Sequence, residues 1–232
     1  MRRITSRELL DDDAGDPADL EASLLDLWDI NRQYGGAKGS LTLLDRVFAR
    51  TGSRQLRILD VGAGDGRLAA WLRRELARRG FQARICALDQ RISHLSYQRP
   101  SPDLVERVVA DALEMPFQQN SFEVVMCNLF VHHFSGAELS GLLREMLRVS
   151  GEAVLVNDLE RRWLPYLFVR YGPFGVRSAI TRHDAAASVR QAYTRRELTA
   201  VASGCSAAST NVIALPFFRL GAILWKTSPP TS

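Results

Sequence analysis

Residues 58–72, with the sequence ILDVGAGDGRLAAWL, form an apolar run that breaks into glycines and then resumes with apolar residues at helical spacing. Three glycines alternate over five positions, at Gly62, Gly64 and Gly66. A buried strand that leads through a glycine-rich turn into a helix presents backbone N–H groups to a ligand at the carboxyl end of the strand. The run therefore predicts an α/β fold in which a ligand contacts this turn.

The apolar segments extend this prediction to the rest of the chain. Helices are expected at residues 20–32, 41–50, 64–79 and 136–149, and strands at 56–62, 83–89, 107–111, 122–130 and 151–158. Strands without polar–apolar alternation, separated by helices, are typical of a parallel sheet covered on both faces. Residues 209–228 predict two further strands that turn at Pro216 into an antiparallel hairpin. We therefore expect a Rossmann-like, mostly parallel seven-stranded sheet with helices on both faces and a C-terminal hairpin.

The length of 232 residues suits one domain with a full core. Within it we expect a helical N-terminal cap, a ligand-binding core, an insertion that covers the substrate and a pair of C-terminal strands. These parts span residues 1–50, 51–158, 159–200 and 201–232, in that order.

Composition narrows the classes of protein that the chain can belong to. No apolar run reaches the about 20 residues that a membrane-spanning helix needs, and the N-terminal sequence lacks the apolar segment of a secretory signal. Cys86, Cys127 and Cys205 are far apart in apolar surroundings, so we expect buried thiols and no metal centre. The net charge of +4 is modest, and arginines on solvated helix faces explain it without a nucleic-acid partner. We expect a cytoplasmic protein without stable membrane insertion.

The glycine turn does not fit the common nucleotide motifs. Arg67 stands where the dinucleotide fingerprint needs its third glycine, and the Gly-Lys-Ser/Thr of a Walker loop is absent. The run D-x-G-x-G-x-G from Asp60 to Gly66 instead resembles motif I of class I S-adenosylmethionine-dependent methyltransferases. Residues 110–125, ADALEMPFQQNSFEVV, are similar to a run of the ubiquinone/menaquinone-biosynthesis-like branch, with Glu123 in place of the usual Asp. The resemblance covers residues 40–160.

This resemblance implies S-adenosylmethionine as the cofactor and assigns roles at three strand ends. Asp89 would accept hydrogen bonds from the two ribose hydroxyls, Asp111 would receive the adenine amino group, and the backbone carbonyl of Asn128 would meet the methionine amino group. Each acid taken singly is equally an ordinary loop residue or helix cap. The expected cofactor-binding residues are Tyr34, Asp60, Gly62, Ala63, Gly64, Gly66, Asp89, Gln90, Asp111, Ala112, Leu113, Asn128 and Leu129.

Two adjacent histidines follow the fourth strand, at the strand end that faces the methyl group in this fold. A phenol has a pKa of about 10, so a base in hydrogen-bond reach would help transfer to a hydroxyl acceptor. The motif resemblance to small-molecule O-methyltransferases places such a base at His132, with His133 as its neighbour. The alternative is that both rings only shape the pocket wall.

The insertion is rich in aromatic residues that suit a flat or apolar acceptor. The expected substrate-pocket residues are Trp163, Tyr166, Tyr171 and His183. A helix that packs on the sheet explains these aromatics equally well, and His183 with Asp184 is also explained as a charge pair of a helix.

We therefore expect a methyltransferase that acts on a phenolic or enolic oxygen of a small aromatic or polyketide-like acceptor. A C-methyltransferase acting on a quinol-type ring is the first alternative. An RNA methyltransferase is a further one, but the Asn-Leu-Phe-Val sequence from Asn128 lacks the Pro-Pro of enzymes that methylate base nitrogens. The sequence leaves a monomer and a homodimer equally open.

Overall fold

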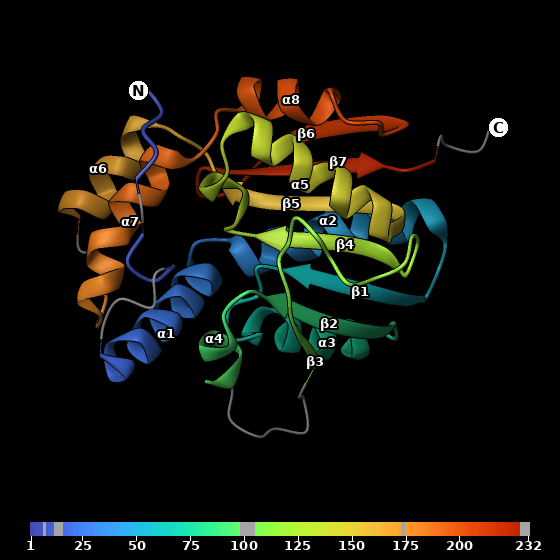
Figure 1. The fold of residues 1–232 in the computed structure, drawn as a ribbon, viewed down its shortest axis with the longest axis horizontal. Coiled ribbons are helices and arrows are strands. Elements are labelled where there is room, and N and C mark those ends of the chain that lie inside the picture. The colour runs from blue at the N-terminus through green and yellow to red at the C-terminus, as the bar shows by residue number, and fades with distance from the viewer. Residues whose placement is uncertain (7, 12–15, 98–104, 173–174, 228–232) are drawn as a thin grey trace.

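The computed structural model describes residues 1–6, 8–11, 16–97, 105–172 and 175–227. They form a seven-stranded sheet with the order β3-β2-β1-β4-β5-β7-β6 (Figure 1). The first five strands of the chain are parallel, and β7 runs antiparallel to both β5 and β6. The strands are β1 Gln55–Val61, β2 Gln82–Asp89, β3 Glu106–Val109, β4 Phe122–Asn128, β5 Ser150–Leu159, β6 Ser209–Leu215 and β7 Arg219–Trp225. The predicted fold class is confirmed.

Helices cover both faces of this sheet and also its carboxyl end. Helices α2 and α3 lie on one face and α5 and α8 on the other, whereas α1, α6 and α7 gather beyond the ends of the parallel strands (Figure 1). The helices are α1 Pro17–Gln33, α2 Gly36–Thr51, α3 Arg67–Arg78, α4 Ile92–Ser96, α5 Gly136–Val149, α6 Trp163–Tyr171, α7 Ala179–Gln191 and α8 Arg195–Ser203, with a short 3₁₀ turn at Val131–His133.

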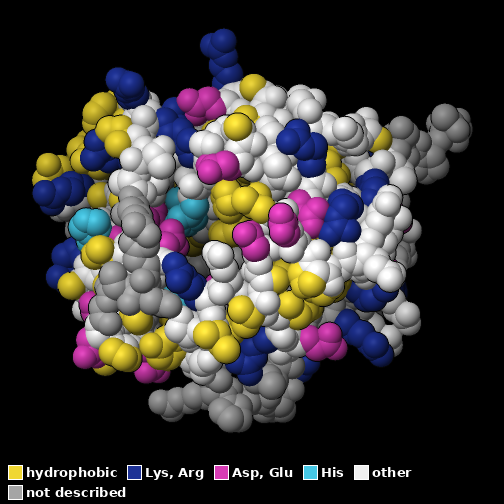
Figure 2. Space-filling model, in the orientation of Figure 1, with side chains coloured by type: hydrophobic (Ala, Val, Ile, Leu, Met, Phe, Trp, Pro, Cys, Tyr) yellow, Lys and Arg dark blue, Asp and Glu magenta, His cyan; other side chains and the backbone are white. Residues whose placement is uncertain are grey.

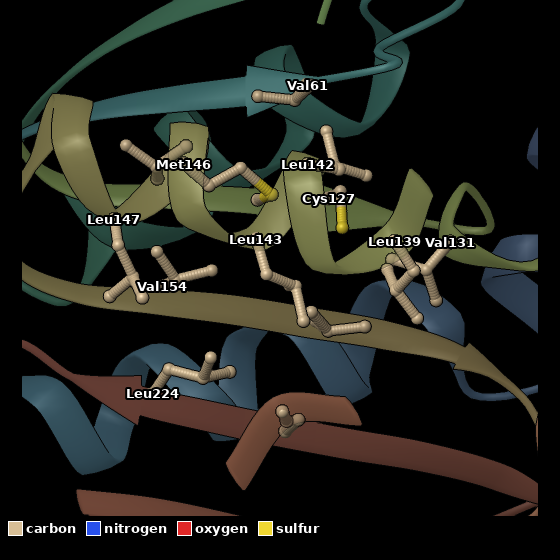
Figure 3. Close-up of a cluster of buried hydrophobic side chains, with 14 of the residues drawn as sticks. Val61, Cys127, Val131, Leu139, Leu142, Leu143, Met146, Leu147, Val154 and Leu224 are labelled. Atoms are coloured by element: carbon tan, nitrogen blue, oxygen red, sulfur yellow. The ribbon is translucent and has the colours of Figure 1, made fainter. Parts of the chain in front are cut away.

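Helix α5 shows how the sequence builds this core. Ser135 and Glu138 form a capping box at its N-terminus, which satisfies backbone N–H groups that the helix leaves unpaired. The apolar residues that follow at helical spacing are fully buried against β4 and β5 (Figure 3). They are Leu139, Leu142, Leu143 and Met146. The three cysteines are buried and unpaired, as predicted.

Two helix boundaries differ from the sequence prediction. Helix α2 begins at Gly36 and not at Leu41, because glycines inside it allow close packing: a Cβ at Gly36 would lie 1.6 Å from Asn31 Oδ1. Helix α3 begins at Arg67 and not at Gly64, because Gly64 and Gly66 have positive φ angles of 57° and 77°. Each difference arises from glycines that serve tertiary contacts or a turn.

The insertion at 159–200 divides into two structural parts. Helices α6 and α7 join α1 beyond the strand ends, whereas α8 extends past residue 200 and packs on the sheet beside β6. A bridge between Glu160 and Tyr193 closes the base of the insertion. Within the described ranges, no helix has the length and apolar character to cross a membrane.

Candidate functional site

A cavity of about 910 Å³ lies between the carboxyl ends of the parallel strands and helices α1, α6 and α7. The turn after β1, the end of β2 and the loop after β4 form one side of it. The N-terminal segment 8–11 and the tip of the β6–β7 hairpin complete the wall. On the left of the molecular face in Figure 2, histidine atoms lie beside acidic ones around a hollow in the surface.

The glycine turn is built by positive φ angles and by one close contact. Gly62 has a φ of 67°, and a Cβ there would lie 2.3 Å from the ring of Phe130. At Gly64, with a φ of 57°, the nearest atom to an added Cβ is Leu24 Cδ2 at 3.7 Å. The glycines are therefore required by the backbone and, at Gly62, by an aromatic ring that lines the same cavity.

Asp89 connects the end of β2 to this turn. Its carboxylate accepts hydrogen bonds from the backbone N–H of Gly64 (2.8 Å) and of Arg91 (2.9 Å). Burial raises the pKa of the Asp89 carboxyl above its ordinary value, although these hydrogen bonds and His94 oppose the shift. Each carboxylate oxygen has a second lone pair, so Asp89 keeps acceptor sites toward the cavity that it lines.

Asp60 lies beneath the turn and does not line the cavity. It is buried, and its Oδ2 atom has no hydrogen-bond partner among the described residues. Burial, with a smaller contribution from the charge of Asp89, raises the pKa of the Asp60 carboxyl to about 7. An unpartnered buried oxygen is costly, and the raised pKa reduces this cost because a neutral carboxyl is easier to bury than a charged one.

A second set of unpartnered polar atoms lies at the end of β4 and the start of β7. Asn128 donates from Nδ2 to Asn31 Oδ1 (3.1 Å), but its own Oδ1 has no partner within the described ranges. Arg219 is buried and donates from Nε to the carbonyl oxygen of Tyr34 (3.0 Å), while its Nη1 is unpartnered there too. Burial lowers the pKa of Arg219 to about 10. This guanidinium lines the cavity, and the sequence prediction missed it.

Nine of the thirteen expected cofactor residues line the cavity: Tyr34, Gly62, Gly64, Asp89, Gln90, Asp111, Ala112, Leu113 and Leu129. Asp60, Ala63, Gly66 and Asn128 lie just behind it, in or next to the same turns. Asp111 shapes its own loop by accepting a hydrogen bond from the Leu113 backbone N–H at 2.8 Å. The structure therefore brings the predicted cofactor residues to one place.

His132 lies in the wall between two carboxylates. Its Nδ1 is 2.8 Å from Asp158 Oδ1, and its Nε2 is 3.6 Å from Glu8 Oε1. Burial alone would lower the pKa of this ring, but the charges and hydrogen bonds of Asp158 and Glu8 raise it to about 10. The two carboxylates therefore favour the protonated ring, whereas a general base must be unprotonated before it accepts a proton.

His133 is half-buried and lines the cavity beside His132, with the two ring centroids 4.2 Å apart. Its Nδ1 is 2.8 Å from Asp11 Oδ2. Glu8 and Asp11 reach this cluster because the Asp184 carboxylate accepts the backbone N–H groups of residues 9 and 10, both at 3.1 Å. Asp184 thus holds the N-terminal segment in place.

Helix α6 presents a different face from the one predicted. Leu164 and Phe168, with the neighbouring Pro165 and Val169, line the cavity. Trp163 and Tyr171 are 60% and 74% exposed, and neither they nor Tyr166 are among the lining residues. His183 also lies outside the lining, with its ring paired to Asp184 at 2.8 Å. These four placements correct the predicted substrate pocket.

The tip of the β6–β7 hairpin adds two aromatic rings to the cavity wall. Phe217 and Phe218 both line the cavity and have φ angles of 58° and 55°. Leu129, after β4, also lines it with a φ of 54°. Positive φ costs a non-glycine residue about 1–3 kcal/mol, and such strain clusters at functional sites.

Comparison with known proteins agrees with this arrangement. Residues 59–152 match the family described as "Methyltransferase domain". Among curated proteins, "Arginine-hydroxylase NDUFAF5, mitochondrial" of Danio rerio is 31% identical over 133 residues, which cover 56% of this chain and 38% of that protein. The chain thus spans well under half the length of this relative.

Solved structures share the whole fold at low sequence identity. A SAM-dependent methyltransferase from Aquifex aeolicus is 15% identical, with a TM-score of 0.62 over 92% of this chain and 100% of that one. The plantazolicin methyltransferase BpumL, solved with SAH, is 14% identical, with a TM-score of 0.66 over 90% and 96% of the two chains. A putative S-adenosylmethionine-dependent methyltransferase from Methanococcus maripaludis is 14% identical, with a TM-score of 0.62 over 97% of both. At these identities the likeness concerns the fold alone.

Proposed function

We propose that this chain, which carries a class I S-adenosylmethionine-dependent methyltransferase domain, moves a methyl group to a phenolic or enolic oxygen of a small aromatic or polyketide-like acceptor. The observation that carries this proposal is the shared cavity of about 910 Å³. On one side lie Gly64, Asp89 and their neighbours, which we expect to contact the nucleoside part of the cofactor. The other side is apolar and aromatic, with Phe168, Phe217 and Phe218 in its wall, which suits a flat acceptor.

S-adenosylmethionine is the cofactor of this domain, and the unpartnered atoms fit its amino-acid end. We place the ammonium group at the wall in front of Asp60 and Asn128, whose unpartnered oxygens lie just behind it, and the carboxylate beside Arg219, which lines the cavity. Asp89 keeps acceptor sites for a vicinal diol. When bound, the cofactor supplies a methyl group already activated by a sulfonium, so the chain itself must align the acceptor, exclude water and manage the acceptor's proton.

We assign His132 a role in positioning the acceptor through the shape of the cavity wall. The Asp158 and Glu8 carboxylates on either side balance the charge of the ring, so its charge is not available to an acceptor anion. Asp158 holds the ring in one orientation through Nδ1. His133, whose Nδ1 faces Asp11, lies at the more open side of the same wall. C-methylation of a quinol-type ring would use the same wall.

Two other readings follow from the named relatives. The curated relative is named as an arginine hydroxylase, so hydroxylation is a second candidate reaction. One structural neighbour is a plantazolicin methyltransferase, so a peptide acceptor is a second candidate substrate class. An RNA acceptor would require binding that weakens steeply with salt.

The deciding experiment begins with calorimetry of the purified chain and S-adenosylmethionine. We expect binding, and then formation of S-adenosylhomocysteine with a panel of phenols, enols, quinols and peptides. Mass spectrometry of the product distinguishes a gained methylene from a gained oxygen, and fragmentation distinguishes an O-methyl from a C-methyl group. A folded chain that does not bind the cofactor would refute the proposal.

A further inference from the structure

The carboxylate and imidazole groups in the cavity wall form a cluster that could hold a metal ion. We infer that Glu8, His132 and His133 bind a divalent first-row transition-metal ion. Each of the three contributes one candidate ligand atom, and these atoms lie within 4.8 Å of one another. Glu8 and His132 are buried, and all three line the cavity. Two imidazoles and one carboxylate are a donor set that suits zinc, iron and related ions.

The surroundings of the two rings are those of metal ligands. Asp158 faces Nδ1 of His132, and Asp11 faces Nδ1 of His133, each at 2.8 Å. Histidines that bind metals generally donate their second ring N–H to such a carboxylate, which fixes the tautomer and the orientation of the ring. In both residues Nε2 is then the nitrogen left for a further ligand. Packing alone does not require that two neighbouring rings each have a carboxylate at Nδ1.

Glu8 is also fixed from behind. Its Oε1 accepts hydrogen bonds from Ser188 Oγ at 2.7 Å and from Gln191 Nε2 at 2.8 Å. This oxygen is also 3.6 Å from His132 Nε2, so the Glu8 carboxylate lies close enough for its other oxygen to share one ion with the ring. Because two donors already hold this carboxylate, it would lose little conformational entropy on binding an ion.

Charge favours a cation at this place. Three carboxylates, from Glu8, Asp11 and Asp158, surround two imidazoles in a partly apolar wall, where charges are weakly screened. Three protein ligands leave coordination positions open, as in catalytic metal sites. Because the cluster lines the cavity, an oxygen of the acceptor can occupy such a position. The His132 ring would bind the ion in its neutral form, and the ion would supply the positive charge at the acceptor oxygen.

The test is a titration of the full chain with Co²⁺, followed by visible absorption, after removal of any polyhistidine tag. We expect saturation at one ion per chain and displacement by Zn²⁺. Glu8→Gln and His133→Gln should each weaken binding by at least about 10- to 100-fold, and Asp11→Asn by about that range. Glu75→Gln is the matched control for Glu8→Gln, because the carboxylate of Glu75, on helix α3, pairs with Arg79 and does not line the cavity, and this variant should bind Co²⁺ like the unchanged chain.

Absence of Co²⁺ binding by the unchanged chain would overturn the inference, and so would binding that Glu8→Gln, His133→Gln and Asp11→Asn all leave intact. Thermal unfolding in chelator and the affinity for S-adenosylhomocysteine identify any variant that is misfolded. Asp11 is the most exposed of these residues, so its variant decides if the others fail to fold. Ion binding is measured without acceptor or methyl donor, so this inference and the proposed methyl transfer fail separately.

Discussion

Replacing His132 by Gln should destabilise the fold strongly at neutral pH. The ring is 2% exposed and lies between the Asp158 and Glu8 carboxylates. The substitution removes the cation and leaves a buried Asp158 without its partner, which costs about 3–5 kcal/mol. For a domain of this size, at about 2–4 °C per kcal/mol, that loss corresponds to a fall in Tm of roughly 6–20 °C.

The stabilisation that His132 gives to the fold should depend on pH. The pKa of His132 is raised from 6.5 to about 10 in the folded chain, despite the opposing effect of burial. The stabilisation is therefore complete below a pH of about 6.5 and declines as the pH rises through about 10. We expect the difference in unfolding free energy between the unchanged chain and His132→Gln to shrink over that window.

The assay is denaturant unfolding in chelator, so that no metal ion contributes, at a series of pH values. The double variant with Asp158→Asn should recover part of the loss, because it removes the uncompensated charge as well. The reasoning is refuted if His132→Gln lies within about 0.5 kcal/mol of the unchanged chain at neutral pH. A difference that grows toward high pH would contradict it equally.

Three further predictions concern the turn, the cap and the cofactor. Gly62→Ala should cost at least about 1–3 kcal/mol in thermal unfolding, because its φ is 67° and the new Cβ would lie 2.3 Å from the Phe130 ring; a neutral result would contradict this. Phe168→Ala should raise the KM for the acceptor about 10-fold, whereas the outward Trp163→Ala should not, and equal effects in steady-state kinetics would place the acceptor elsewhere. S-adenosylmethionine affinity should rise with pH through about 7 as Asp60 ionises, and calorimetry of Asp60→Asn should show a flat profile.

The sequence predicts the sheet, the glycine turn and the strand-end side of the cavity because these features depend on local patterns. Gly62, Gly64 and Asp89 lie at strand ends that the apolar runs identify, and parallel strands bring their ends together. The same logic placed His132 in the wall. The direction in which its pKa shifts could not be predicted, because this depends on Asp158 and Glu8, which are distant in the sequence and meet the ring only in the fold.

The residues that were missed lack any local signal. Arg219 is one cation in an apolar run, and only the packing of α1 against the hairpin shows that it is buried and incompletely paired. Helix α6 has aromatic residues on both sides, so its periodicity does not choose between the face of Phe168 and that of Trp163. That choice is made by tertiary contacts of α6 with α7 and of Phe168 with the Tyr34 ring, whose centroid is 5.7 Å away.

The strained tip of the hairpin makes this protein a good subject for engineering. Phe217 and Phe218 keep a left-handed backbone that Asn or Gly adopts readily, so an Asn–Gly replacement should make the protein more heat-resistant. The same exchange would remove two aromatic rings from the wall of the cavity, where we propose that the acceptor binds. Variants at these two positions should therefore differ in both thermal stability and substrate range. We expect the variants with less backbone strain to accept a wider range of substrates.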